Sequence, residues 1–142
     1  MLSIWEGTTN ILSLDALRAM ERSDVLTEWA ADVKRRVGAV KAAALASSVD
    51  QTLKAVKRIE HYVAHAATAG NDSQQGGARA FAFAIARTES ATLLIEHGSV
   101  QDDRAAITSA QRWCARELAP LVEADAKHRA SSAALNESGP PG

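Results

Sequence analysis

The feature that most constrains the fold of this chain is the spacing of its apolar residues, which recur every three to four positions. The clearest stripe lies in the middle of the chain and comprises Val49, Leu53, Val56, Ile59, Val63 and Ala67. This spacing places side chains on one face of an α-helix. Hydrophobic residues make up 46% of the 142 residues but aromatics only 4%, and the abundant alanine favours helices over strands. The sequence therefore predicts an all-α fold with a packed core.

The same periodicity predicts about five helices in an up-and-down, bundle-like arrangement. They are expected at about residues 9–20, 23–46, 48–70, 78–97 and 102–118. Ser48 and Gln51 have the spacing of a capping box, which would start the third helix. Asp102 or Asp103 is expected to start the fifth, because an aspartate oxygen can accept from the free N–H groups of a first helical turn.

The segments between and beyond these helices contain the residues that usually interrupt helices. Residues 1–8 are expected to form a loop, and residues 70–77, "GNDSQQGG", a flexible polar connector. Gly98 is expected to end the fourth helix. Residues 131–142, "SSAALNESGPPG", are expected to be a disordered C-terminal tail because they cannot bury enough apolar surface.

Composition also excludes several classes of protein. The net charge of −1 gives no overall field that would attract nucleic acid or a membrane surface, and no apolar run reaches the roughly 18 residues of a membrane-spanning helix. Cys114 has no second cysteine to pair with, and we expect it to be a small buried residue. No nucleotide-binding glycine motif is present. A reducing interior suits this chain: mitochondrial or peroxisomal in a eukaryote, cytoplasmic in a bacterium.

The opening stretch "SIWEGTTNIL" contains the most suggestive chemistry. Glu6 lies between the aromatic Trp5 and the small Gly7, where a bound cofactor would exclude water, raise the pKa of the carboxyl group and suit it to act as a general base. Thr8 and Thr9 follow at the expected start of a helix, whose free N–H groups can hold an oxyanion. From the residues alone, an ordinary loop glutamate followed by a helix cap explains the stretch more simply.

Longer stretches of the chain resemble a known family. The segment "IWEGTTNILSLDALR" is similar to the C-terminal active-site motif of the acyl-CoA dehydrogenases. The segments "FAFAIART", "LLIEH" and "RWCARELAPL" resemble the helical region appended in the long-tailed, AidB-like branch of that family. The resemblance implies that residues 1–22 are the active-site loop and the last helix of the dehydrogenase bundle. It further implies an appended helical domain over residues 23–130 and a tail over residues 131–142.

The resemblance also implies roles for the opening residues. Glu6 matches the catalytic base, which removes the α-proton of an acyl-CoA thioester while the β-hydrogen leaves as hydride to FAD. In the family, the backbone N–H of this glutamate also helps to hold the thioester carbonyl. Two positions match residues that contact the substrate, Trp5 and Gly7. Four match residues that contact FAD: Thr8, Thr9, Asn10 and Ile11. Most members carry tyrosine at the position of Trp5 and glutamine or glutamate at that of Asn10. The bulkier tryptophan puts a straight-chain acyl substrate in doubt.

The resemblance further implies that much of the catalytic protein lies outside these 142 residues. Family members place an N-terminal helical domain, a β-domain and most of a helical bundle before the motif. We therefore expect this chain to be a fragment that is inactive alone and belongs to a homo-oligomeric oxidoreductase acting on CH–CH bonds. The apolar residues Ile4, Ile11, Leu14 and Leu17 should then be partly exposed. The alternative is a non-catalytic helical module for oligomerisation or nucleic-acid binding.

Three other patterns each have a functional explanation and a simpler one. His61 and His65 are one helical turn apart and could bind a metal if a third ligand were present, but solvated side chains explain them more simply. Residues 34–58 hold seven basic residues against one acid, a local charge of +6. This run could bind nucleic acid, but it contains no aromatic residue to stack on bases, and a solvated helix face is the simpler explanation. Trp29 and Trp113 are expected to anchor the core.

Overall fold

The computed structural model describes residues 2–20, 22–66, 71–101 and 103–121. These residues form five α-helices and one short 3-10 turn, and no strand occurs among them, which confirms the predicted all-α fold. The elements are α1 (Leu2–Met20), α2 (Ser23–Gly38), η1 (Ala43–Leu45), α3 (Ala46–Ala66), α4 (Asn71–Gln101) and α5 (Arg104–Cys114). The predicted C-terminal tail, residues 131–142, lies outside the described residues.

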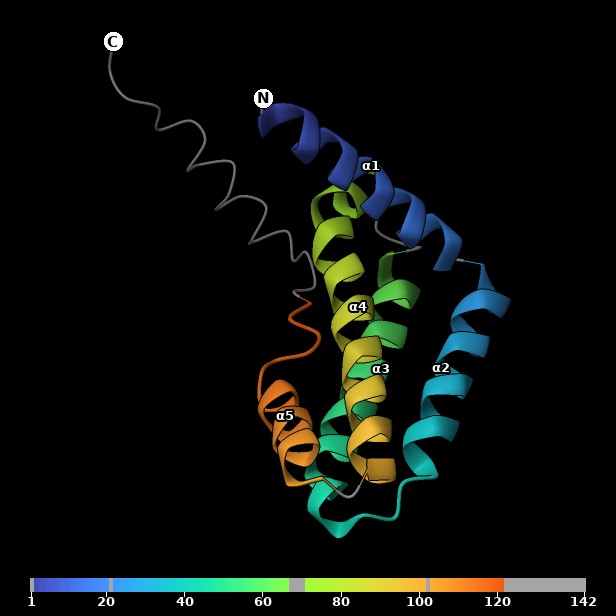
Figure 1. The fold of residues 1–142 in the computed structure, drawn as a ribbon. Helices are drawn as coiled ribbons and strands as arrows, with labels where there is room; N and C mark the ends of the chain where they lie inside the picture. Colours follow the sequence, from blue (N-terminus) through green and yellow to red (C-terminus); the bar gives the residue numbers. More distant parts are fainter. Residues whose placement is uncertain (1, 21, 67–70, 102, 122–142) are drawn as a thin grey trace.

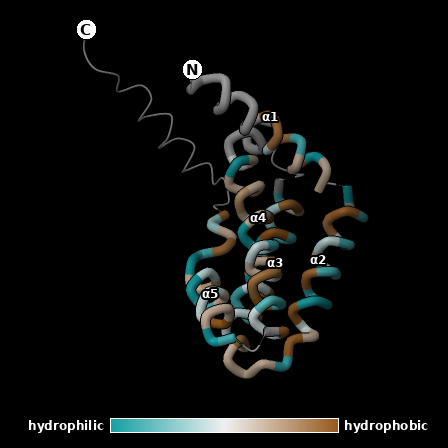
Figure 2. The backbone as a smooth tube through the Cα atoms, in the orientation of Figure 1, coloured by the Kyte–Doolittle hydropathy of each residue, from teal (hydrophilic) through white to brown (hydrophobic). Residues whose placement is uncertain are grey.

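Helix α4 is the centre of the fold. It is 31 residues long and packs against each of the other four helices. Helices α2 and α3 run alongside it and α5 covers its other side, whereas α1 crosses the upper end of this group (Figure 1). Apolar and polar segments alternate along α2 and α3 (Figure 2), as in helices that bury one face.

The core between these helices combines large side chains with small ones. Phe81 and Ile95 of α4 are fully buried and stand among buried alanines of the same helix. Thr88 and Thr92 are also fully buried, and their hydroxyls donate to backbone carbonyls one turn earlier, at 2.8 and 3.0 Å. These hydrogen bonds offset the cost of burying the hydroxyls, so the small residues of α4 let its neighbours approach closely.

The expected loop over residues 1–8 is wrong, because α1 begins at Leu2. Thr8 and Thr9 consequently lie inside the helix instead of capping it. A glycine inside a helix costs about 1 kcal/mol and a threonine less. Once residues 11–20 form a helix, each residue added before them closes a further backbone hydrogen bond, which is enough to continue the helix through Gly7.

Two predicted boundaries around α2 and α3 are also wrong. Helix α2 ends at Gly38, well before the predicted Ala46, and Ser48 and Gln51 lie inside α3 instead of capping it. The turn between the helices is fixed by Leu45 of η1, which is fully buried. This buried side chain anchors the connection to the core, which a helical pattern alone does not show.

The predicted polar connector over residues 70–77 is helical from Asn71, as the start of α4. Gly77, which the sequence suggested as a helix breaker, has a packing role inside the helix instead. A Cβ atom at this position would lie 1.8 Å from the hydroxyl oxygen of Tyr62 on α3, so the glycine allows close packing between the two helices. Burial of that tyrosine raises the pKa of its phenol, which keeps the hydroxyl neutral.

Gly98 does not end α4, which continues to Gln101. A Cβ atom at position 98 would lie 3.3 Å from the backbone N of Ile107 on α5, so this glycine also permits a close approach of two helices. The predicted cap at Asp103 is confirmed, since its carboxylate accepts from the N–H of Ala105 at 3.1 Å. Helix α5 ends at Cys114, four residues before the predicted Leu118.

Replacing Gly98 by valine is expected to destabilise the fold by about 1–3 kcal/mol, because the new methyl groups press against the backbone of α5. Gly38→Val is the matched control, since nothing lies within 4 Å of a Cβ atom placed there. Urea unfolding followed by circular dichroism measures both. Equal midpoints for the two variants would contradict the packing role of Gly98.

Candidate functional site

All seven residues implicated by the opening motif lie on consecutive positions of α1. The backbone places Glu6 in the second turn of the helix, so it does not lie at the helix mouth as expected. Positions 6 and 10 are one turn apart on the same face, as are positions 7 and 11. The helix thus brings the proposed base and the proposed flavin contacts together over about 9 Å along its axis.

The second half of α1 is anchored in the fold, whereas its middle is exposed. Leu17 and Ser13 are buried, with exposed fractions of 1% and 4%. Ile11 and Leu12, which directly precede Ser13, are 62% and 63% exposed. The expected partial exposure is therefore confirmed for Ile11 and for Leu14, which is of intermediate burial, and wrong for Leu17. The side chain of Ile4 lies outside the described residues.

Two pockets of the described part of the chain lie away from α1. The larger, about 380 Å³, lies between η1, α3 and α5 and is lined by uncharged residues: Ala44, Ser47, Ser48, Gln51, Gln111, Cys114 and Ala115. Burial raises the pKa of the Cys114 thiol, and its Sγ lies 4.0 Å from the Thr52 hydroxyl. The thiol is 3% exposed and stays protonated, so its prediction as a small buried residue is confirmed. The smaller pocket is described below.

The histidine pair does not form part of a metal site among the described residues. The ring of His65 lies within hydrogen-bonding distance of the backbone carbonyl of His61, 2.9 Å from its Nδ1, and the two ring centroids are 4.1 Å apart. The adjacent Glu60 accepts from Lys34 at 2.8 Å. No group of three metal-type side chains occurs in the part of the chain that the structure describes.

The basic run over residues 34–58 is largely neutralised. Five of its seven basic residues form ion pairs: Lys34, Arg35, Arg36, Lys54 and Arg58. Most of the partner carboxylates lie outside the run, on other turns and helices, which is why the local count of +6 overstated the charge. The structure therefore favours an ordinary helix surface over a nucleic-acid site, and it adds ion pairs that the sequence did not predict.

Arg36 forms ion pairs with several carboxylates and joins α2 to α4. Its Nε and one terminal nitrogen donate to both oxygens of Glu96 at 2.9 and 2.6 Å, and the other terminal nitrogen donates to Glu89 at 2.5 Å. The guanidinium side chain is 16% exposed. Its hydrogen bonds hold the pKa of Glu96 below the ordinary range. Such forked, charge-assisted bonds fix orientation as well as adding energy.

Trp29 and Trp113 both pack against the core while remaining partly exposed, so their predicted role as anchors is confirmed in part. The indole N–H of Trp113 donates to the backbone carbonyl of Arg87 at 3.1 Å. This hydrogen bond ties the end of α5 to the middle of α4.

With this geometry established, comparison with known proteins identifies the family. A family model described as "Acyl-CoA dehydrogenase 11 C-terminal domain-like" matches residues 24–139. The chain belongs to this family. The chain is also 32% identical over 128 residues to "Acyl-CoA dehydrogenase family member 11" of Caenorhabditis elegans, an alignment that covers 84% of this chain and 20% of the relative. No solved structure matches.

This acyl-CoA dehydrogenase-type chain therefore spans about a fifth of the length of its curated relative. The family match begins at residue 24, in the first turn of α2, so the motif residues of α1 precede it. The division at residues 22 and 23 remains a prediction, as do the roles of residues 5–11. None of the described helices is long and apolar enough to cross a membrane.

Proposed function

We propose that this chain is the C-terminal part of an FAD-dependent oxidoreductase that removes the α- and β-hydrogens of an acyl-CoA thioester. One observation carries the proposal: the matched acyl-CoA dehydrogenase C-terminal domain begins at residue 24, with five residues between it and the end of the motif "IWEGTTNILSLDALR". Two independent signals, a short active-site motif and a long helical domain, occur in the order that such an enzyme requires.

In this proposal Glu6 is the base that accepts the α-proton, since a carboxylate held beside a substrate carbon can remove a proton during the chemical step. Trp5 and Gly7 contact the acyl-CoA, and the glycine lets the substrate approach the backbone. Bound FAD would supply the hydride acceptor. Thr8, Thr9, Asn10 and Ile11 would contact the flavin along one edge.

We expect the chain to contribute an edge of a flavin site and not a complete one. Cofactor pockets usually enclose about 300–1,000 Å³ and bury most of the ligand. No described residue of α1 lines either of the two pockets reported above, and the exposed Ile11 and Leu12 face away from the core. The rest of the flavin site, and the homo-oligomer that we propose for the full-length protein, would come from residues outside this chain.

The isolated 142-residue chain is expected to purify colourless, while a longer protein with the dehydrogenase domains before α1 is expected to be yellow. Visible absorbance of the flavin and its release on denaturation measure both. A yellow 142-residue chain with stoichiometric FAD would show that the flavin site lies within it. A folded but colourless longer protein would refute FAD as the cofactor.

A further inference from the structure

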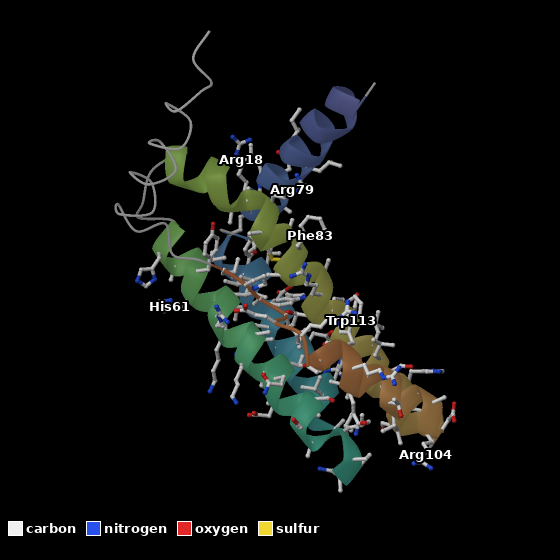
Figure 3. The ribbon with its side chains drawn as sticks, turned by 90° about the vertical axis from the view of Figure 1, so that its left-hand side faces the viewer. Arg18, His61, Arg79, Phe83, Arg104 and Trp113 are labelled. Atoms are coloured by element: carbon white, nitrogen blue, oxygen red, sulfur yellow. The ribbon has the colours of Figure 1, made fainter. Side chains whose placement is uncertain are left out.

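A row of alternating arginines and aromatic rings runs from α4 to the end of α5. The guanidinium carbons of Arg79 and Arg87 lie 5.8 and 5.9 Å from the ring centroid of Phe83. The guanidinium carbon of Arg116 lies 6.0 Å from the ring centroid of Trp113. The indole N–H of Trp113 donates to the backbone carbonyl of Arg87. Figure 3 shows Arg79, Phe83 and Trp113 one after another along α4 toward α5. We call these five residues the arginine–aromatic ladder.

The arginines of the ladder have no carboxylate partner among the described residues. All three of its arginines are exposed, and none forms an ion pair with a carboxylate in the described ranges. The nearby acid Glu117 is engaged by Arg58 at 2.6 Å. The ladder thus differs from the basic run at residues 34–58, where most of the cations are paired. Three unpaired guanidinium groups beside exposed apolar surface favour an anionic partner.

A small pocket lies at the end of the ladder that Arg87, Trp113 and Arg116 form. It measures about 150 Å³ and is lined by Arg87, Trp113, Arg116, Glu117 and Leu118. This is too small for a cofactor or nucleotide, whose pockets usually start near 300 Å³, but a cavity of about 150 Å³ holds a single benzene-sized group. The pocket therefore suits one aliphatic or aromatic side chain between two arginines.

We propose that the ladder docks an acidic segment of a partner protein. Carboxylates of the segment would bind the guanidinium groups, which offer forked donors matched to carboxylate oxygens, and one apolar side chain would enter the pocket as an anchor. Single-stranded nucleic acid fits less well. Its bases stack on open aromatic faces, whereas guanidinium groups already lie over the rings of Phe83 and Trp113.

Binding of a labelled peptide to the 142-residue chain, followed by fluorescence anisotropy, tests the proposal. The probe carries glutamates on both sides of a central leucine, and two matched peptides replace the glutamates by glutamine or the leucine by glycine. We expect the acidic probe to bind, the glutamine peptide to bind at least about tenfold more weakly, and the glycine peptide several-fold more weakly. Rising salt should weaken the complex.

Variants locate the binding surface. The double variant Arg87→Gln, Arg116→Gln is expected to weaken binding of the acidic probe at least about tenfold. Arg104→Gln on α5, an exposed arginine outside the ladder (Figure 3), is expected to change it little. Circular dichroism checks that each variant remains folded.

Several results would overturn the proposal: equal binding of acidic and glutamine peptides, no effect of the double variant, or an equal effect of Arg104→Gln. Tighter binding of an oligothymidine than of the acidic probe would replace the partner with a nucleic acid. Sedimentation that showed a dimer abolished by the double variant would replace it with a second copy of this chain.

Discussion

In a longer protein that carries the dehydrogenase domains before α1, Glu6→Gln is expected to slow reduction of FAD by acyl-CoA by about 10²–10⁴-fold or more. The amide is nearly the same size as the carboxylate but cannot accept the α-proton, so the loss falls on the chemical step while FAD stays bound. Anaerobic mixing with acyl-CoA, followed by bleaching of the flavin, measures the rate.

Glu28→Gln is the matched control, because Glu28 is an exposed acid on α2, outside the motif. Its flavin should bleach as fast as that of the parent. Trp5→Tyr is the companion variant and restores the residue that is commoner in the family, so it should change which acyl chain reacts fastest. Normal bleaching by Glu6→Gln would place the base elsewhere and remove the role assigned to the motif.

Arg36→Met is expected to lower the free energy of unfolding by about 2–3 kcal/mol at neutral pH. Removing one partner of a fully buried ion pair typically costs 3–5 kcal/mol, and the estimate here is lower because Glu89 and Glu96 are each 35% exposed. The substitution leaves Asp32, Glu89 and Glu96 without their shared cation, and α2 loses its forked link to α4. Urea unfolding measures the change.

The dependence of stability on pH distinguishes the contribution of the ion pairs from that of packing alone. Hydrogen bonds from Arg36 hold the pKa of Glu96 below its ordinary value of 4.5. A depressed folded-state pKa stabilises the protein fully above the unfolded value, and this stabilisation is lost as the pH falls through the folded value. The parent should therefore lose stability below about pH 4.5, whereas Arg36→Met should lose less.

Arg18→Met is the control for this pair of predictions. Arg18 lies 3.6 Å from Asp15, and both side chains are more than 60% exposed, so its removal should cost little. If Arg18→Met and Arg36→Met were equally destabilised, or if Arg36→Met kept the full acid sensitivity of the parent, the cluster would not contribute as we infer.

Local pattern was sufficient to predict the helices and part of the core, because burial of one helical face leaves a periodic trace in the sequence. The stripe through Val56, Ile59 and Val63 is buried as expected. Gly77 and Gly98 were misjudged because a glycine that ends a helix and one that admits a neighbouring helix look alike in sequence. The ion pairs of Arg36 were missed because Glu89 and Glu96 lie 53 and 60 positions away.

The candidate site was also predictable only as far as local sequence patterns reach. The proposal that Glu6 is a base rests on the resemblance of a short motif, and no rule of spacing in this chain would have selected it over other glutamates. The arginine–aromatic ladder had a partial signal, since Arg79, Phe83 and Arg87 are spaced by four on one helix. Trp113 and Arg116 join it only through the packing of α5 on α4.

The length of helix α1 has a mechanical consequence for the position of the proposed base. It runs unbroken from Leu2 to Met20, and Leu17 fixes its far end in the core. The proposed base at Glu6 is about 16 Å along the axis from that anchor, so a tilt of about 10° at Leu17 would move it by about 3 Å by simple leverage. Displacements of about 1 Å can cost two orders of magnitude in rate. Small changes in how the core holds Leu17 would therefore be magnified at the position proposed for the base.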